Sequence, residues 1–470
     1  MTETHDFDLI IIGSGPGGYV AAVRAAQLGL KTVCIEKEAR LGGVCLNKGC
    51  IPSKALLDSS EYYHLARNEL AAHGVKTGKV SLDLATMMAR KDQVVQDLTT
   101  NVRKLLEGHK VEIIQGTARL TAPGEVAVQD QEKKERKITA RKILLATGST
   151  PVSLPGLAFD PRQIVSSTEA LSLDEVPKHL GIVGGGYIGL ELGSVWLRLG
   201  AKVTVIEMLP KIGTGLDSQV ARTLDRILRK QGLELHLNTR VVDAAVSGRN
   251  VKVTVEKEEK RETFSFDRLL VSVGRRPLTA GLGLEELGIQ TDPKSGQVMV
   301  DENYQTNVPG IFAIGDLIPG PMLAHKASAE GIAAVEKMAG RHGEVNYDAI
   351  PAVIYTHPEV ACVGITENQA RERDIPHCVG SYPFTGAGRA RCMGETDGFV
   401  KLIAHAKTDR ILGVHIIGAR AADMIAECVL AMEFGASSED IARTVHGHPT
   451  FAEALMEAAM AVRKCAIYGS

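Results

Sequence analysis

The sequence predicts an α/β protein of two to four domains, and three observations carry this prediction. A strand, a glycine-rich loop, a helix and a second strand follow one another over residues 8–36, and the same pattern returns over residues 180–207. From Tyr347 onward, short strands and helices follow an α+β pattern instead. With 470 residues, the chain is too long to fold around one hydrophobic core.

The first glycine loop has the pattern of a phosphate-binding turn. Gly13 permits the tight turn, Gly15 lets the backbone approach a pyrophosphate, and Gly18 packs the helix against the sheet. Glu36 ends the second strand, where it is placed to accept hydrogen bonds from ribose hydroxyls. A strand, loop, helix and terminal acid in register indicate a Rossmann-like dinucleotide-binding fold.

The second glycine loop repeats the first, with each landmark displaced by 171 positions. The paired landmarks are Gly13 and Gly184, Gly15 and Gly186, Gly18 and Gly189, and Glu36 and Glu207. The repeat therefore predicts two dinucleotide-binding folds in one chain. Met208, and not an arginine, follows Glu207, which favours an unphosphorylated ribose and hence NAD over NADP. Two cationic residues, Lys202 and Lys211, lie nearby, so the preference for NAD over NADP rests on Glu207.

Two cysteines five positions apart lie in a glycine-flanked stretch over residues 42–54. In a regular helix, Cys45 and Cys50 would be separated by roughly 7.5 Å along the axis, beyond the roughly 7 Å limit on Cα separation for a disulfide. If they pair, the backbone must leave regular helix between them, which Gly49 makes easy. Pro52 places Cys50 at or just before a helix N-terminus, which favours a thiolate. The alternative is two reduced cysteines with a structural role.

Patterns outside these units place the domain boundaries. The expected elements are a helix within 79–107, a small antiparallel sheet over 111–142, and a buried strand over 143–149. We expect four parts: residues 1–150 with the first dinucleotide fold and the cysteine pair, 151–277 with the second fold, 278–346 completing the first site, and 347–470 as the α+β domain. In the last part, strands are expected near 352–364, 377–383, 398–404 and 411–417, and helices from about 421 and 437.

One acidic residue is a candidate ligand for a cofactor. The strand over residues 310–316 stops at Asp316, which would reach ribityl or ribose hydroxyls from the strand end. The alternative role of Asp316 is to cap the helix expected near residues 324–339.

The last helix follows a histidine and a proline. His448 and Glu453 lie on adjoining turns, so the carboxylate could orient the imidazole and support its protonated form. We expect Thr450 to cap this helix; the alternative for His448 is a capping histidine near a turn.

Composition excludes several classes of protein. With 54 basic and 56 acidic residues, the net charge is −2, and we expect neither nucleic acid nor an anionic membrane as partner. The eight cysteines form no Cys-x-x-Cys pair, which argues against structural zinc. No targeting peptide precedes the first strand and no apolar run has spanning length, so a soluble, cytoplasmic protein is expected.

Taken together, these motifs resemble the flavin-linked disulfide reductases, also called class I pyridine nucleotide-disulfide oxidoreductases, over nearly the whole chain. The resemblance is closest to the branch that oxidises dihydrolipoamide. It is carried by the cysteine stretch, both glycine loops, and the stretches Ala146-Thr147-Gly148, Gly315-Asp316, Met322-Leu323-Ala324-His325-Lys326 and His448-Pro449-Thr450 with Glu453. Lys48 and Gly447 depart mildly from the family pattern, away from any reacting atom.

The resemblance implies FAD in the first fold and NAD in the second. It implies that FAD is bound by Gly13, Gly15, Gly18, Glu36, Lys37, Gly43, Lys54, Gly116, Thr147, Gly148, Asp316 and Ala324. For NAD it implies Gly184, Gly186, Tyr187, Ile188, Gly189, Glu207 and Gly274. The catalytic residues implied are Cys45, Cys50, His448 and Glu453, with no metal.

The implied reaction oxidises protein-bound dihydrolipoamide to lipoamide and reduces NAD⁺. His448 would take a proton from the substrate, whose thiolate would attack Cys45 of a Cys45–Cys50 disulfide; Cys50 would pass electrons to the flavin, beside Lys54. The resemblance also implies a homodimer in which His448 and Glu453 serve the cysteines of the other subunit. The partner would be the subunit-binding region of an acyltransferase core in a 2-oxoacid dehydrogenase complex, or a glycine-cleavage carrier.

Three alternatives remain at this stage. A glutathione reductase shares the cysteine pair but uses NADPH, typically with arginines where this chain has Glu207 and Met208. A mercuric-ion reductase carries an additional cysteine pair near the C-terminus, where this chain has only Cys465. A dinucleotide-binding protein without redox turnover would not need the cysteine pair and His448.

Overall fold

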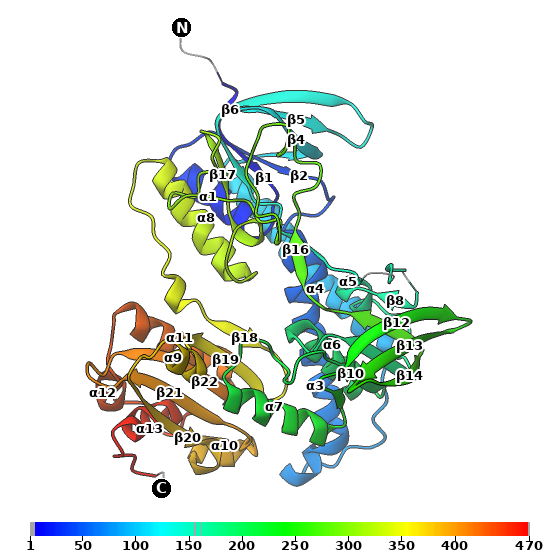
Figure 1. The fold of residues 1–470 in the computed structure, drawn as a ribbon, viewed down its shortest axis with the longest axis vertical. Helices are drawn as coiled ribbons and strands as arrows, with labels where there is room; N and C mark the ends of the chain where they lie inside the picture. The colour runs from blue at the N-terminus through cyan, green and yellow to red at the C-terminus, as the bar shows by residue number, and fades with distance from the viewer. Residues whose placement is uncertain (1–4, 155–156, 161, 469–470) are drawn as a thin grey trace. The chain divides into compact units, whose positions relative to one another are not determined.

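The computed structural model describes residues 5–154, 157–160 and 162–468, and they form two compact units (Figure 1). Unit 1 comprises Met1–Leu56, Asp83–Val152 and Gly274–Val345. Unit 2 comprises Leu57–Leu82, Ser153–Val273 and Asn346–Ser470. In the part of the chain described, no helix is both long and apolar enough to cross a membrane.

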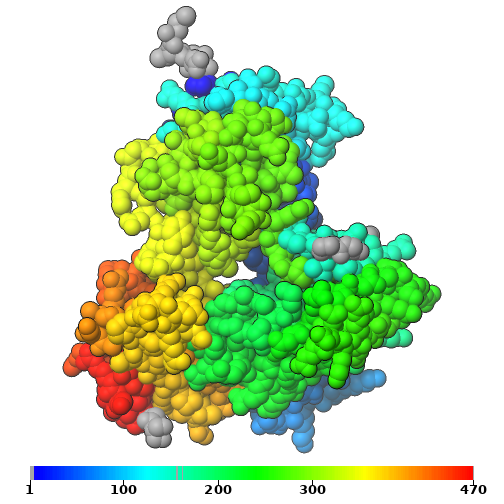
Figure 2. All heavy atoms as spheres, viewed as in Figure 1, coloured from blue at the N-terminus to red at the C-terminus, as the bar shows by residue number. Residues whose placement is uncertain are grey.

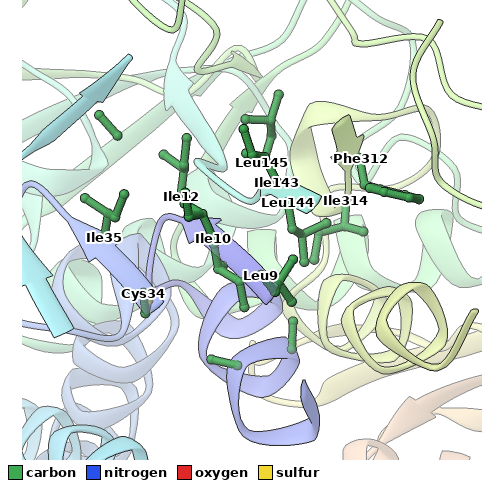
Figure 3. Close-up of a cluster of buried hydrophobic side chains, with 14 of the residues drawn as sticks. Leu9, Ile10, Ile12, Cys34, Ile35, Ile143, Leu144, Leu145, Phe312 and Ile314 are labelled. Atoms are coloured by element: carbon green, nitrogen blue, oxygen red, sulfur yellow. The ribbon is translucent and has the colours of Figure 1, made fainter. Parts of the chain in front are cut away.

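A parallel sheet in the order β3-β2-β1-β6-β17 forms the core of unit 1. Its strands are β1 Phe7–Ile12, β2 Thr32–Glu36, β3 Glu112–Gln115, β6 Glu135–Leu145 and β17 Ile311–Ala313. These strands are rich in buried aliphatic residues, as is typical of a parallel sheet covered on both faces. Figure 3 shows side chains of β1, β2, β6 and β17 gathered in one apolar cluster.

The antiparallel part of unit 1 continues from the same sheet. Strands β4 Thr117–Ala122 and β5 Glu125–Gln129 form a meander with the first half of β6. The prediction of an antiparallel sheet over 111–142 followed by a separate strand over 143–149 is therefore wrong in two details. Strand β3 pairs in parallel with β2, and β6 is one strand that serves both parts, because its second half pairs with β1 and β17.

Helices α1 Pro16–Gln27 and α8 Ala324–Met338 pack against each other in unit 1 through small residues (Figure 1). A Cβ on Gly331 would lie 2.6 Å from the carbonyl oxygen of Gly17, so only glycine permits this approach. The helix expected within 79–107 is α4 Leu84–Gly108, which begins after Asp83 caps it by accepting a hydrogen bond from the amide of Thr86. A short ribbon pairs β7 Ser149–Pro151 with β16 Arg275–Pro277.

Unit 2 contains the second parallel sheet, in the order β11-β10-β9-β15-β8. Its elements are β8 Ile164–Val165, α5 Ser167–Ala170, β9 His179–Val183, α6 Tyr187–Arg198, β10 Lys202–Ile206, α7 Ser218–Gln231, β11 Glu234–His236 and β15 Arg268–Val271. An antiparallel sheet of β12 Arg240–Ser247, β13 Asn250–Lys257 and β14 Lys260–Phe266 adjoins it. In Figure 2 the atoms of these three strands, in green, lie at the surface of unit 2.

The C-terminal part of unit 2 is an antiparallel sheet in the order β18-β19-β22-β21-β20, as the α+β prediction required. Its strands are β18 Ala352–Ile354, β19 Glu359–Gly364, β20 His377–Pro383, β21 Phe399–His405 and β22 Ile411–Gly418. Its helices are α9 Glu367–Glu372, α10 Gly388–Met393, α11 Ala421–Glu433, α12 Ser438–Arg443 and α13 Glu453–Val462. The strand expected near 352–364 is thus two strands joined by a turn.

The remaining helices and 3-10 turns lie between the elements already described. They are α2 Gly43–Lys48, α3 Cys50–Asn68 and the 3-10 turns η1 Leu70–His73, η2 Gly315–Leu317, η3 Tyr347–Ala349 and η4 Phe384–Gly386. Residues 278–345 belong to the same unit as the first fold, and the second fold belongs to the same unit as the C-terminal sheet. The finer division into four domains stays a prediction.

Candidate active site

The first glycine loop has the steric properties that its sequence predicts. Gly13 has a φ of +104°, and a Cβ there would lie 2.4 Å from the carbonyl oxygen of Ala146. A Cβ on Gly18 would lie 1.9 Å from the carbonyl oxygen of Gly13, so these two positions require glycine. A Cβ on Gly15 would have no atom within 4 Å, which leaves the backbone open to a ligand at this position.

The second loop repeats this geometry residue by residue. Gly184 has a φ of +106°, and a Cβ there would lie 2.5 Å from the carbonyl oxygen of Ser272. A Cβ on Gly189 would lie 2.3 Å from the carbonyl oxygen of Gly184, while one on Gly186 would have no atom within 4 Å. Both loops therefore combine two tightly packed glycines with one open glycine at the helix N-terminus.

The acids at the ends of β2 and β10 are buried and bind their own loops. The Oε2 atom of Glu36 accepts hydrogen bonds from the amide and hydroxyl of Ser14, at 3.0 and 2.6 Å. The Oε2 atom of Glu207 accepts one from the amide of Gly185 at 2.6 Å, and its Oε1 atom accepts one from Leu209 at 2.7 Å. Because each carboxylate oxygen has two acceptor positions, these contacts leave room for ribose hydroxyls.

The cysteine pair lies where one helix ends and the next begins. Cys45 is in α2 and Cys50 is the first residue of α3, as predicted, and the chain leaves regular helix at Gly49, with φ −147° and ψ −112°. Both cysteines are in the reduced, thiol form. A hydrogen bond between the two side chains, together with burial, holds the pKa of Cys45 well above its usual range, against the opposing charge of Lys54. The structure thus brings the two sulfur atoms together.

The cysteine pair adjoins the first glycine loop. Gly43, the first residue of α2, has a φ of +60°, and a Cβ there would lie 2.6 Å from the Cα atom of Gly15. The amide of Gly42 also donates to the carbonyl oxygen of Ser14 at 3.0 Å. These close backbone contacts place the helix that carries Cys45 against the open glycine of the loop.

Most of the other residues assigned to the first site lie just after the strands β2, β3 and β6 of the parallel sheet. The amide of Gly116 donates to the carbonyl oxygen of Glu36 at 2.9 Å, and the Thr147 hydroxyl donates to that of Leu278 at 2.8 Å. Gly148 has a φ of +74° with open space beside it, Ala324 begins α8, and Lys37 is exposed.

Asp316 lies in η2, directly after β17, and does not cap α8. That helix has Leu323 as its N-cap and no side-chain cap, so the capping alternative for Asp316 is wrong. The Oδ2 atom of Asp316 instead accepts a hydrogen bond of 2.5 Å from the Ser149 hydroxyl. The sequence placed Ser149 at the end of a buried strand and gave it no role in the site, although it directly follows Ala146-Thr147-Gly148.

A buried ion pair holds the backbone of the turn that carries Asp316. Lys326 and Glu330 are fully buried and 3.0 Å apart. The Lys326 ammonium donates to the carbonyl oxygen of Gly315 at 3.1 Å, and the Gly315 amide donates to Glu330 at 2.8 Å. Two charged residues four apart in an alanine-rich helix are the sequence signal for this pair, which the sequence analysis did not use.

In unit 2, His448 and Glu453 form the pair that their spacing predicts. The Nδ1 atom of His448 lies 2.8 Å from the Oε1 atom of Glu453, and the Thr450 amide donates to the Oε2 atom at 2.8 Å. Burial acts to raise the pKa of Glu453, but hydrogen bonds from His448 and Thr450 outweigh it, so that pKa lies below its ordinary value. The His448 side chain is 78% exposed and therefore accessible to a substrate.

Two neighbours of His448 do not belong to the pair that it forms with Glu453: Thr450 and His446. Thr450 does not cap the last helix, because α13 has Ala452 as its N-cap and the Thr450 hydroxyl donates to the carbonyl oxygen of Gly447. His446 binds a different carboxylate, with its Nε2 atom 2.8 Å from Glu427. Within the described ranges, no group of three or more His, Cys, Asp or Glu residues could hold a metal ion.

The remaining residues assigned to NAD divide between the units. Tyr187 and Ile188 begin α6, and burial raises the pKa of Tyr187 to about 12. Gly274, with a φ of +133°, belongs to unit 1, whereas the Gly184 loop belongs to unit 2. The catalytic candidates divide in the same way, with the cysteine pair in unit 1 and His448 with Glu453 in unit 2.

Comparison with known proteins identifies the family. Residues 7–331 match the pyridine nucleotide-disulphide oxidoreductase family, and residues 350–459 match the dimerisation domain of the same family. The chain therefore belongs to the pyridine nucleotide-disulphide oxidoreductases.

Curated relatives and solved structures agree with this assignment. The chain is 51% identical to dihydrolipoyl dehydrogenase 2, mitochondrial, of Arabidopsis thaliana, over 97% of this chain and 90% of the relative. It is also 51% identical to the mitochondrial dihydrolipoyl dehydrogenase of Schizosaccharomyces pombe, with the same coverage. The crystal structure of LpdA from Mycobacterium tuberculosis matches with a TM-score of 0.89 and 26% identity, over 96% of this chain and 99% of that one.

Proposed function

We propose that this protein oxidises dihydrolipoamide to lipoamide and reduces NAD⁺ to NADH. The observation that carries the proposal is the pair of adjacent thiols, Cys45 and Cys50, next to the open glycine of the first dinucleotide loop. Identity of about 50% to curated dihydrolipoyl dehydrogenases supports the same activity. Dihydrolipoyl dehydrogenases use FAD and NAD as cofactors.

FAD fits the first fold because the residues present there suit its phosphates and hydroxyls. The open Gly15 and the N-terminus of α1 suit a pyrophosphate, and Glu36 and Asp316 offer carboxylates to hydroxyl groups. When bound, FAD would carry the electron pair between the dithiol and NAD⁺. We assign NAD to the Gly184 loop because Glu207 follows β10 with no arginine behind it.

The protein residues would handle the sulfur and the proton. Glu453 holds the Nδ1 atom of His448, which directs the Nε2 atom to the substrate thiol as a general base. The substrate thiolate would attack Cys45 of the oxidised pair, forming a mixed disulfide and releasing Cys50 as a thiolate. The second substrate thiolate would then attack the sulfur that is bonded to Cys45, closing lipoamide and leaving the dithiol.

We further propose a homodimer in which His448 of each subunit serves the cysteine pair of the other. The match of residues 350–459 to a dimerisation domain supports this arrangement, as do the exposed apolar side chains of Leu430, Phe434 and Val445. Hybrid dimers formed from Cys45→Ser and His448→Gln parents test it, since one of the two sites in each hybrid would combine the intact cysteine pair of one chain with the intact His448 of the other. Hybrids as inactive as both parents would contradict the shared site.

An acyltransferase core that presents lipoyl groups is the proposed protein partner, docked near the dimer axis. The cytoplasm is the proposed location, although the curated relatives include mitochondrial proteins. Co-purification with acyltransferase subunits and cell fractionation test these two proposals.

Steady-state rates with two substrate pairs test the proposed activity. We expect turnover of dihydrolipoamide with NAD⁺ to exceed that of glutathione disulfide with NADPH by orders of magnitude. The reverse preference would instead assign the protein to the glutathione reductase branch.

A further inference from the structure

Among the described residues, only one of the two carboxylate oxygens of Asp316 accepts a side-chain hydrogen bond. Its Oδ2 atom accepts the hydrogen bond of 2.5 Å from the Ser149 hydroxyl. Its Oδ1 atom accepts none from any residue that the structure describes. An ionised carboxylate only accepts hydrogen bonds, so the free oxygen suits a ligand that donates one, such as a hydroxyl group.

The guanidinium of Arg275 holds Ser149 at two points. Its Nε atom donates to the Ser149 hydroxyl oxygen at 2.7 Å, and its Nη2 atom donates to the Ser149 carbonyl oxygen at 2.7 Å. Because arginine can only donate, the hydroxyl proton of Ser149 is left for Asp316. The three residues therefore form a chain of hydrogen bonds with one direction, from Arg275 through Ser149 to Asp316.

Backbone pairing brings Arg275 and Ser149 together. Both lie in the β7–β16 ribbon, in which Ser149 is opposite Pro277 and Arg275 is opposite Pro151. Burial lowers the pKa of Arg275, while the charges of Asp316 and Cys50 act to raise it. The cation is thus partly desolvated, which strengthens its hydrogen bonds to Ser149.

We propose that Arg275 is a positioning residue for flavin binding, which acts through Ser149 to fix Asp316 with its Oδ1 atom turned to a hydroxyl of the FAD ribityl chain. This inference rests on the proposed function, because it takes Asp316 to lie in an FAD site. The sequence analysis used residues 274–277 only to mark the end of the second fold and gave Arg275 no role.

The first test measures the affinity of flavin-free protein for FAD by titration with fluorescence detection. Arg275→Met should weaken FAD binding about tenfold or more, the size expected for hydrogen bonds to a charged group. Arg275→Lys should recover part of the loss, because it keeps the charge but not the two-point geometry. Arg276→Met, at the exposed neighbouring position, is the matched control and should bind FAD like the parent.

A double-mutant cycle separates positioning from general destabilisation. In an Asp316→Asn or Ser149→Ala background, Arg275→Met should cost little further FAD affinity, and NAD affinity of the second fold should stay unchanged. Parent-like FAD binding by Arg275→Met, or losses that add in the cycle, would overturn the inference. A parent protein that binds no FAD would instead overturn the proposed function.

Discussion

The Nδ1 atom of His448 lies 2.8 Å from the Oε1 atom of Glu453, while the other oxygen of that carboxylate accepts the Thr450 amide. The carboxylate is therefore fixed from two sides and sets the orientation of an exposed imidazole. This arrangement requires no other part of the chain, since all three residues lie within six positions of one another.

His448→Gln should lower the rate of dihydrolipoamide oxidation by about 10² to 10⁴-fold, as expected for loss of a general base. Glu453→Gln should lose less, because the imidazole remains. The measurement is kcat with dihydrolipoamide and NAD⁺. His446→Gln is the control, since His446 binds Glu427 instead, and a comparable loss there would argue against a specific role for His448.

Replacement of either cysteine by serine should abolish lipoamide turnover, because a disulfide then cannot form between positions 45 and 50. Flavin should remain bound in both variants, which absorbance of the purified protein would reveal. Cys378→Ser, at an exposed position outside the site, should retain activity. Near-full activity in Cys45→Ser or Cys50→Ser would remove the disulfide from the mechanism.

The parent enzyme should prefer NAD⁺ over NADP⁺ by at least about tenfold in kcat/KM, because the Glu207 carboxylate repels a 2′-phosphate. Glu207→Gln should reduce the ratio of kcat/KM for NAD⁺ to that for NADP⁺. The glutamine keeps a carbonyl oxygen that can accept the hydrogen bond from the Gly185 amide. Lys211→Gln tests whether the nearby cation matters and should leave the preference in place. Equal specificity constants in the parent would refute the ribose argument.

Gly15→Ala and Gly18→Ala should affect different properties, FAD binding and stability respectively, although both residues lie in one loop. Gly18→Ala should lower the free energy of unfolding of flavin-free protein by about 1–3 kcal/mol or more, since its Cβ would lie 1.9 Å from a carbonyl oxygen. Gly15→Ala should leave that stability nearly unchanged and weaken FAD binding. Thermal unfolding and FAD titration of both variants check the contrast.

A buried ion pair should make stability fall in acid. Lys401 donates to both carboxylate oxygens of Asp217 at 3.0 Å. Burial acts to raise the pKa of Asp217, but the hydrogen bonds and charge of Lys401 outweigh it, leaving the pKa below its ordinary value of 3.8.

Because the folded-state pKa of Asp217 is lowered, its contribution is complete above the unfolded pKa and disappears as pH falls through the folded value. Asp217→Asn should therefore lose stability at pH 7 and show a shallower decline below about pH 4. Denaturant unfolding across this pH range is the measurement. An unchanged acid decline would contradict the assignment to this pair.

Local patterns predicted the parts of the site that depend on nearby residues. The turns at Gly13 and Gly184, the start of α3 at Cys50 and the pair of His448 with Glu453 all follow from spacing within a few residues. Thr450 was wrongly expected to cap α13, because the helix starts two residues later than its sequence suggests and the hydroxyl turns back to Gly447.

Contacts between distant segments could not be predicted in the same way. Ser149 meets Arg275 across 126 positions and Asp316 across 167, and no periodicity relates them. The continuity of β6 was missed for the same reason, since its two halves pair with different neighbours and carry different patterns.

The β7–β16 ribbon also determines where the chain leaves unit 1 and where it re-enters that unit. The amide of Val152 donates to the carbonyl oxygen of Gly274 at 3.1 Å, so the polypeptide departs from unit 1 and returns to it at the same place. Residues 153–273 belong to unit 2 together with residues 57–82 and 346–470, so the ribbon joins the two points at which this segment leaves unit 1 and re-enters it. A substitution that opens the ribbon should therefore loosen both ends of this segment at once.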